Sequence, residues 1–152
     1  MISFMTVIHG FEFPDDLYYL IEKHVWVRMA EDGTARLGLT PVAYKLLRDS
    51  VVAISMKSSI VGRQVAKGKS LAMVESLKYI GPLSAPFDGI FLQGNERLAA
   101  EPDLAVADPY GEGWIAVMRP SDWDAARRDL VTGPEAMAVY QALLEAGKIA
   151  RD

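Results

Sequence analysis

The stretch VGRQVAKGKSLAMVESLKYIGPLSAPFDGIF, residues 61–91 of this 152-residue chain, decides the fold. In its first third, small turn residues alternate with apolar residues that can fill a flattened barrel: Gly62, Val65, Gly68 and Leu71. A strand is predicted over 70–76. The chain must then turn near 77–79, because pairs of turn residues punctuate the segment before residues 90–92 pair again. Lys78 is therefore predicted to lie at the tip of a β-hairpin.

Upstream of this stretch, the pattern predicts an antiparallel hairpin followed by a short helix. Residues 24–28 and 35–39 are apolar segments on either side of an Asp-Gly turn. The pair Thr40-Pro41 provides an N-cap and a first-turn proline for a helix that extends to Asp49. Residues 51–54 are predicted to form a buried strand.

Downstream, we predict an irregular connection over 101–109, a closing strand over 114–118 and an amphipathic helix over 121–130. The pair Gly133-Pro134 is expected to break that helix before a last helix over 135–146. On the last helix, apolar residues recur at i, i+3 and i+7: Met137, Tyr140 and Leu144. This stripe is expected to pack on the domain, with a docking surface for a partner as the alternative.

These elements predict a single, mainly β domain with short helices over residues 1–152. The core is expected to cover about 18–118, and a helical C-terminal extension 121–150. The hydrophobic share of 51% and the charged share of 24% are typical of a soluble globular protein.

The composition argues against several classes of protein. The 16 Lys and Arg residues against 20 Asp and Glu residues give a net charge of −4, so nucleic acid is not expected as a partner. With no cysteine and two histidines, a metal site and a thiol nucleophile are not expected. No apolar run is long enough to span a membrane, and the N-terminus lacks the charge pattern of an export signal. A cytoplasmic location without a membrane partner is therefore predicted.

The segments around Lys78 resemble a known family. The pattern G-x-x-V-x-x-G-x-x-L-x-x-x-E-S-x-K, followed by small-Pro-x-x-Gly, resembles the lysine-bearing hairpin of lipoyl-carrier domains. Among these it is most similar to the H-protein of the glycine cleavage system. Further segments extend the resemblance over about 18–118: Glu22-Lys23-His24-Val25-Trp26-Val27, Gly38-Leu39-Thr40, Ala43, Asn95, Leu98, Pro102, Leu104 and the run from Asp108 to Trp114.

The resemblance implies a flattened lipoyl/biotinyl-type barrel-sandwich hybrid in which Lys78 forms an amide with lipoic acid. It also implies that Glu75 is recognised by the lipoyl-attaching enzyme. The protein would then be a carrier and not an enzyme, with a flexible lipoamide arm that enters the active sites of soluble partners. No nucleophile, acid–base pair or phosphate-binding glycine loop accompanies the lysine, so no catalytic residue is expected.

Departures from the family pattern bear on the partners. The run Glu75-Ser76-Leu77-Lys78-Tyr79 replaces the usual E-S-V-K-A, Arg48 replaces a usual Gly, and Val106 replaces a usual Asn. With the segment 10–19 and an extra helix from Glu135, these features are similar to the lipoate-binding proteins of bacterial sulfur oxidation. The favoured hypothesis is therefore a carrier for a heterodisulfide-reductase-like complex. The alternative is an H-protein that carries an aminomethyl group between glycine cleavage enzymes, and dihydrolipoamide dehydrogenase is a further candidate partner.

Other roles for Lys78 fit the sequence less well. Biotin carriers share the barrel but flank their lysine with methionines, whereas the neighbours here are Leu77 and Tyr79 and Met73 lies upstream. A Schiff-base or general-base lysine needs a desolvating pocket, which a hairpin tip does not provide. A third hypothesis is an unmodified interaction module with the carrier fold, against which the retained pair of Glu75 and Lys78 argues.

Three further features have both a structural and a functional interpretation. Tyr79 is expected to cover apolar surface of the hairpin, with packing on the arm or a clash with a glycine-cleavage partner as the alternatives. His24, beside Trp26, is expected to pack, with acid–base catalysis as the alternative. Two groups of like charges are expected to be solvated faces, with electrostatic docking as the alternative. They are the bases Lys57, Arg63, Lys67 and Lys69 and the acids Glu101, Asp103, Asp108 and Glu112.

Overall fold

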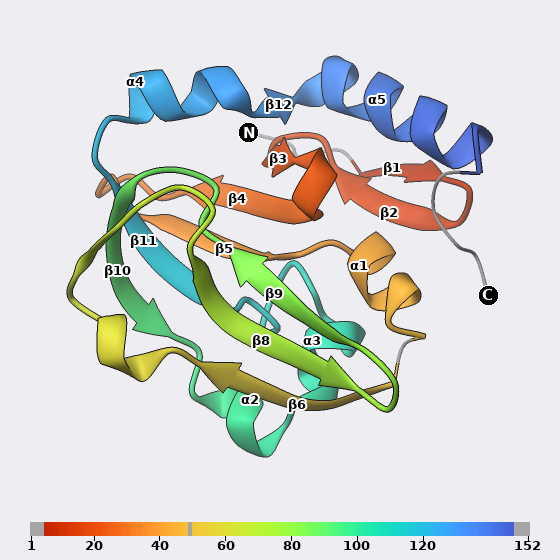
Figure 1. The fold of residues 1–152 in the computed structure, drawn as a ribbon. Coiled ribbons are helices and arrows are strands. Elements are labelled where there is room, and N and C mark those ends of the chain that lie inside the picture. Colours follow the sequence, from red (N-terminus) through yellow and green to blue (C-terminus); the bar gives the residue numbers. More distant parts are fainter. Residues whose placement is uncertain (1–4, 49, 148–152) are drawn as a thin grey trace.

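The computed structural model describes residues 5–48 and 50–147, and its strands form three antiparallel sheets (Figure 1). In spatial order, the largest sheet contains β12 (Val131–Thr132), β3 (Tyr18–Leu20), β4 (Val25–Met29), β5 (Ala35–Leu39), β11 (Ala116–Pro120), β10 (Gly89–Gly94) and β7 (Gln64–Val65). The second sheet contains β6 (Val51–Met56), β8 (Ser70–Ser76) and β9 (Ile80–Ser84). A small N-terminal hairpin pairs β1 (Met5–Ile8) with β2 (Phe11–Pro14). The predicted mainly β architecture is confirmed.

Short helices connect and cover these sheets. They are η1 (Ile21–Lys23), α1 (Pro41–Leu46), η2 (Ser58–Ile60), α2 (Arg97–Ala100), α3 (Asp103–Ala107), α4 (Trp123–Ala126), η3 (Arg127–Asp129) and α5 (Gly133–Glu145). In Figure 1, α4 and α5 lie beside β12, on the far side of the molecule from β6. Within residues 5–48 and 50–147, no helix has both the length and the apolar character that crossing a bilayer requires.

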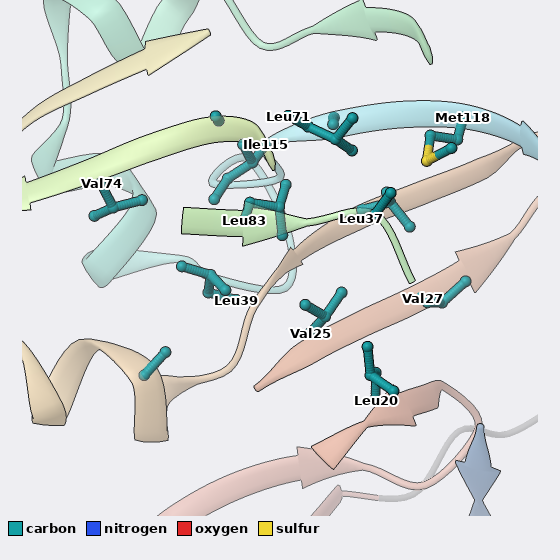
Figure 2. Close-up of a cluster of buried hydrophobic side chains, with 14 of the residues drawn as sticks. Leu20, Val25, Val27, Leu37, Leu39, Leu71, Val74, Leu83, Ile115 and Met118 are labelled. Atoms are coloured by element: carbon teal, nitrogen blue, oxygen red, sulfur yellow. The ribbon is translucent and has the colours of Figure 1, made fainter. Parts of the chain in front are cut away.

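The main core lies between the long sheet and the three-stranded sheet. Figure 2 shows Val25 and Leu37 of the long sheet pointing into the same core as Val74 of β8 and Leu83 of β9. All four side chains are completely buried. Because burying apolar surface stabilises by about 25 cal/mol per Å², these contacts fasten the inner face of the β8–β9 hairpin to the rest of the protein.

A second core lies between α5, the N-terminal hairpin and β3, and its centre is aromatic. Phe13, Tyr19 and Tyr140 are completely buried. The rings of Phe13 and Tyr140 stack with 4.2 Å between centroids, and Tyr19 meets both rings edge-on. We call these three residues the aromatic cluster. The stripe predicted on the last helix packs on the domain as expected, since Tyr140 and Leu144 are buried and Met137 packs at the edge.

In the N-terminal half, the predicted hairpin is confirmed and two boundaries differ. β4 and β5 pair antiparallel, with Val27 opposite Leu37. The helix after Thr40 ends at Leu46, and Asp49 lies outside the described residues. The side chain of Thr40 makes no capping hydrogen bond. The strand predicted over 51–54 continues to residue 56, because β6 pairs with β8 up to that residue.

In the C-terminal half, the structure differs from five predictions. The segment 101–109 contains the short helix α3, and the closing strand is Ala116–Pro120 because its neighbours β5 and β10 fix its register. Only residues 123–129 of the predicted helix 121–130 are helical, as α4 and η3. The pair Gly133-Pro134 begins α5, since a proline suits the first helical turn. The extension is not purely helical, because β12 joins the sheet beside β3.

Candidate functional site

Lys78 lies at the centre of the turn that joins β8 to β9, and its side chain is exposed. Its neighbours are also exposed although they are apolar: Leu77 by 79%, Tyr79 by 50% and Ile80 by 61%. We call residues 77–80 the hairpin tip. The tip places the amine of Lys78 in solvent, on a hairpin whose inner face is fixed by the main core.

The hydroxyl of Ser76 holds this turn by both donating and accepting a hydrogen bond. It donates to the carbonyl oxygen of Tyr79 at 3.0 Å and accepts from the Tyr79 N–H at 3.0 Å. The backbone N–H of Ser76 also donates to the Tyr79 carbonyl, at 2.8 Å. Ser76 is buried, whereas Tyr79 is half exposed, so these three hydrogen bonds lie at the boundary between the core and the solvent. The tip is thus ordered by its backbone while its side chains remain exposed.

Glu75 lies on the outer face of the three-stranded sheet. It is opposite Ala53 of β6 and Ile80 of β9, and its neighbours in sequence, Val74 and Ser76, are buried on the inner face. The alternation places the Glu75 carboxylate in solvent close to the tip. No ion pair between Glu75 and Lys78 is formed in the described structure, so the carboxylate is available to a partner that approaches the tip.

A pocket of about 310 Å³ adjoins the tip, between the turn that follows α1 and the end of β8. Leu77, Lys78 and Tyr79 line one side of the pocket, and Arg48 and Ser50 line the other. Figure 1 shows the end of α1 on the same side of the molecule as the hairpin tip. The three-dimensional structure therefore brings Arg48 beside a lysine that is thirty positions away in the sequence.

His24 has a structural role at the end of η1. Its backbone adopts the left-handed conformation with a φ of 58°, and its N–H donates to Ile21 while its carbonyl accepts from Thr40. His24 lines a pocket of about 270 Å³ with residues that include Leu39 and Pro82. Burial lowers the pKa of His24 below its ordinary value. The packing interpretation fits this environment better than acid–base catalysis.

The motif residues outside the hairpin hold the fold together. The indole N–H of Trp26 donates to the carbonyl of Pro109 at 3.0 Å. The side-chain amide of Asn95 donates to the carbonyls of Glu112 and Trp114 at 3.0 and 2.7 Å. These bonds tie the loop that precedes β11 to the barrel, which gives the distant motifs a structural function.

The two predicted charge groups are partly neutralised within the chain. Lys67 pairs with Asp129 at 3.4 Å. Arg97 pairs with Glu101 at 2.7 Å and with Glu112 at 3.6 Å. All of these side chains are well exposed, so each pair contributes little to stability. These ion pairs within the chain fit the interpretation as solvated faces better than the alternative of electrostatic docking on partners.

Comparison with known proteins identifies the family. The family model described as glycine cleavage H-protein matches residues 17–143. The chain belongs to the glycine cleavage H-protein family. It is 40% identical over 136 residues to glycine cleavage system H protein 2 of Aquifex aeolicus, with 90% of this chain and 83% of the relative covered. It is 31% identical over 147 residues to probable glycine cleavage system H protein 2 of Sulfolobus acidocaldarius, with 95% and 96% covered.

A solved structure gives the same assignment. The crystal structure of a glycine cleavage system H protein from Mycobacterium marinum superposes with a TM-score of 0.69 at 33% identity, covering 81% of this chain and 94% of that protein. The lipoyl-type barrel-sandwich fold is thereby confirmed. Proteins of the H-protein family are carriers that bear lipoic acid on a lysine and serve partner enzymes, and they are not enzymes themselves.

Sequence reasoning assigned no role to two residues of this site. Ser76 belongs to the E-S-x-K motif and makes two side-chain hydrogen bonds across the turn. The sequence signal for these bonds is a serine at the end of a strand, directly before a turn. Arg48 was a departure from the family pattern. No sequence signal could place it beside the tip, because that proximity arises from the packing of α1 against the rest of the fold.

Proposed function

We propose that Lys78 is the lipoylated residue of this carrier and that Glu75 helps the lipoyl-attaching enzyme to recognise the hairpin. The position of Lys78 supports this most directly: it is the exposed centre of an ordered turn between two strands. In the attachment reaction, Nζ attacks the activated carboxyl carbon of lipoate. The leaving group departs with its electron pair, and the amine loses a proton.

The lipoyl arm would supply chemistry that the chain itself lacks. The sequence contains no cysteine, and a lipoyl group brings a dithiolane that can be reduced to a dithiol. A long tether on a fixed hairpin gives the dithiolane a high effective concentration at the active site of a docked partner. Amide formation also removes the charge of Lys78, which changes the formal net charge from −4 to −5.

For the partners, we propose first the enzymes of the glycine cleavage system, in the cytoplasm, with an aminomethyl group as the cargo. Relatives in bacteria and archaea that are named as glycine cleavage system H proteins support this proposal. The chain aligns with most of the length of each of these relatives. Dihydrolipoamide dehydrogenase is the candidate for reoxidising the arm.

Intact mass tests the site. The protein is produced with an active lipoyl-attaching enzyme, and a single added lipoyl group is expected on the wild type and none on Lys78→Arg, because an arginine cannot be acylated there. Lys57→Arg, an exposed lysine beyond β6, is the matched control and should be modified like the wild type. An unmodified wild type, with the attaching enzyme active on another carrier, would favour the unmodified interaction module.

A second candidate function is the transfer of sulfur or electrons to a heterodisulfide-reductase-like complex. The observation in its favour is the charge beside the tip. An aminomethyl group on the arm is a cation at neutral pH, and Arg48 lines the pocket next to Lys78. When the arm folds back onto this pocket, a cationic neighbour disfavours a cationic cargo and favours an anionic sulfur species such as a thiolate.

Aminomethyl transfer separates the two candidates. The lipoylated protein is incubated with glycine decarboxylase and labelled glycine, and the label on the arm is measured by intact mass. Efficient loading would exclude the sulfur hypothesis as the main function. No loading, with an H-protein from another organism loaded in parallel, would exclude the glycine cleavage context.

A further inference from the structure

Arg48 adopts a backbone conformation that is unfavourable for its residue type. Its φ is +63°, and it follows Leu47, the C-cap residue of α1, in the position where helices commonly end with a glycine. The other non-glycine residues with positive φ in the described structure are His9 and His24, and histidine is among the residue types that tolerate this region. Arginine has no such preference, so this backbone conformation is strained.

The guanidinium of Arg48 is also unpaired within the described structure. It is exposed, and among residues 5–48 and 50–147 it has no ion-pair or hydrogen-bond partner. The backbone N–H of Arg48 is satisfied by the carbonyl of Lys45 at 2.9 Å. Among the described residues, the side chain therefore makes no hydrogen bond or ion pair that would offset the backbone strain.

The surroundings of Arg48 are those of an interface. It lines the pocket of about 310 Å³ beside Lys78, and exposed apolar side chains surround that pocket at the hairpin tip. Val52 of β6, close to the same turn, is also exposed, by 48%. Exposed apolar residues around an unpaired arginine are typical of interface hot spots. Because Lys78 lines the same pocket, an enzyme that acylates Nζ approaches the protein beside Arg48.

Covering the pocket removes water from Arg48, which is costly unless the partner supplies an opposite charge. We propose that Arg48 is a recognition residue that pairs with a carboxylate of the lipoyl-attaching enzyme while that enzyme modifies Lys78. The inference rests on the proposed function, because it requires that Lys78 is lipoylated. It assigns to the pocket an acidic protein partner, and it gives a reason for an arginine at a position that favours glycine.

Lipoylation kinetics with the attaching enzyme of the same organism test this proposal. Arg48→Gly removes the charge and relieves the strain, so the KM for the carrier should rise about 3- to 10-fold at low salt with kcat little changed. The melting temperature of the same variant should rise, by about 2 °C. Arg48→Lys should keep part of the affinity. Raising the salt concentration should raise the KM of the wild type toward that of Arg48→Gly, because salt screens the ion pair with the partner.

The matched control is Arg63→Ala, which removes an exposed positive charge next to β7, in the sheet that does not carry the tip. Its KM should remain within about 2-fold of the wild type. An unchanged KM in Arg48→Gly, or an equal rise in Arg63→Ala, would overturn the proposal. At saturating enzyme all variants should reach full modification, and a wild type that stays unmodified would refute the proposed function instead. A lower melting temperature in Arg48→Gly would overturn the proposal in favour of a structural role.

Discussion

The hairpin tip and the aromatic cluster use large apolar side chains in opposite ways. At the tip, Leu77, Tyr79 and Ile80 are exposed, and the turn is held by backbone groups and one serine hydroxyl. In the aromatic cluster, the side chains are completely buried and their rings contact one another. Both regions are ordered, but the order comes from hydrogen bonds in one and from packing in the other.

The difference shows how a small carrier separates stability from function. Surface that is buried in the aromatic cluster stabilises the fold but cannot meet a partner. Exposed apolar surface at the tip contributes little to the stability of the isolated chain, and it can be buried when an enzyme docks. Substitutions in the aromatic cluster should therefore change mainly the stability, and substitutions at the hairpin tip mainly the lipoylation.

The largest expected effect is the loss of stability in Tyr140→Ala. The substitution removes a completely buried ring that stacks on Phe13, so the free energy of unfolding should fall by about 3–5 kcal/mol. Urea unfolding measures this change, and lipoylation of the folded fraction should proceed at the wild-type rate. Val139→Ala, on the same helix and 38% exposed, should cost less than about 1 kcal/mol. Equal losses in both variants would show that the cluster does not stabilise the fold in this way.

A smaller effect is expected from Ser76→Ala, which removes two hydrogen bonds from the turn. The free energy of unfolding should fall by about 1–2 kcal/mol, and the rate of lipoylation should fall several-fold because the tip loses its fixed geometry. Mass spectrometry over time measures the rate. Ser55→Ala, on the exposed face of β6, is the control and should change neither quantity. A wild-type rate in Ser76→Ala would mean that the backbone alone orders the tip.

The smallest effect concerns His24, which lines the pocket between α1 and β9. Because burial lowers its pKa in the folded state, the unfolded chain binds the proton more readily. Stability is therefore complete above the ordinary histidine pKa and falls as the pH drops through it. His24→Asn, which tolerates the left-handed backbone, should reduce this pH dependence by less than about 1.4 kcal/mol per pH unit.

Urea unfolding at pH 7.5 and 5.5 measures the change in His24→Asn. The control is His9→Asn, an exposed histidine that also has a positive φ, of 51°. A reduction of the same size in both variants would mean that burial of His24 is not its cause.

The sequence predicted the hairpin more accurately than the segments that close the fold. The strand over 70–76 and the turn over 77–79 match β8 and its loop residue by residue, because turn residues and local alternation determine them. The closing strand differs by two residues, and β12 was missed. A two-residue strand has almost no local signal, and its existence depends on pairing with β3, more than a hundred residues away.

The sequence by itself determined that this protein has an exposed lysine on a β-hairpin with Glu75 three residues before it, since both features depend on neighbours along the chain. Only the tertiary structure decided what surrounds that lysine. The hydroxyl of Ser76 closes the turn because β8 and β9 pair, and Arg48 lies beside the tip because α1 packs where it does. Contacts between distant segments depend on how the whole core is filled, and no local pattern records that arrangement.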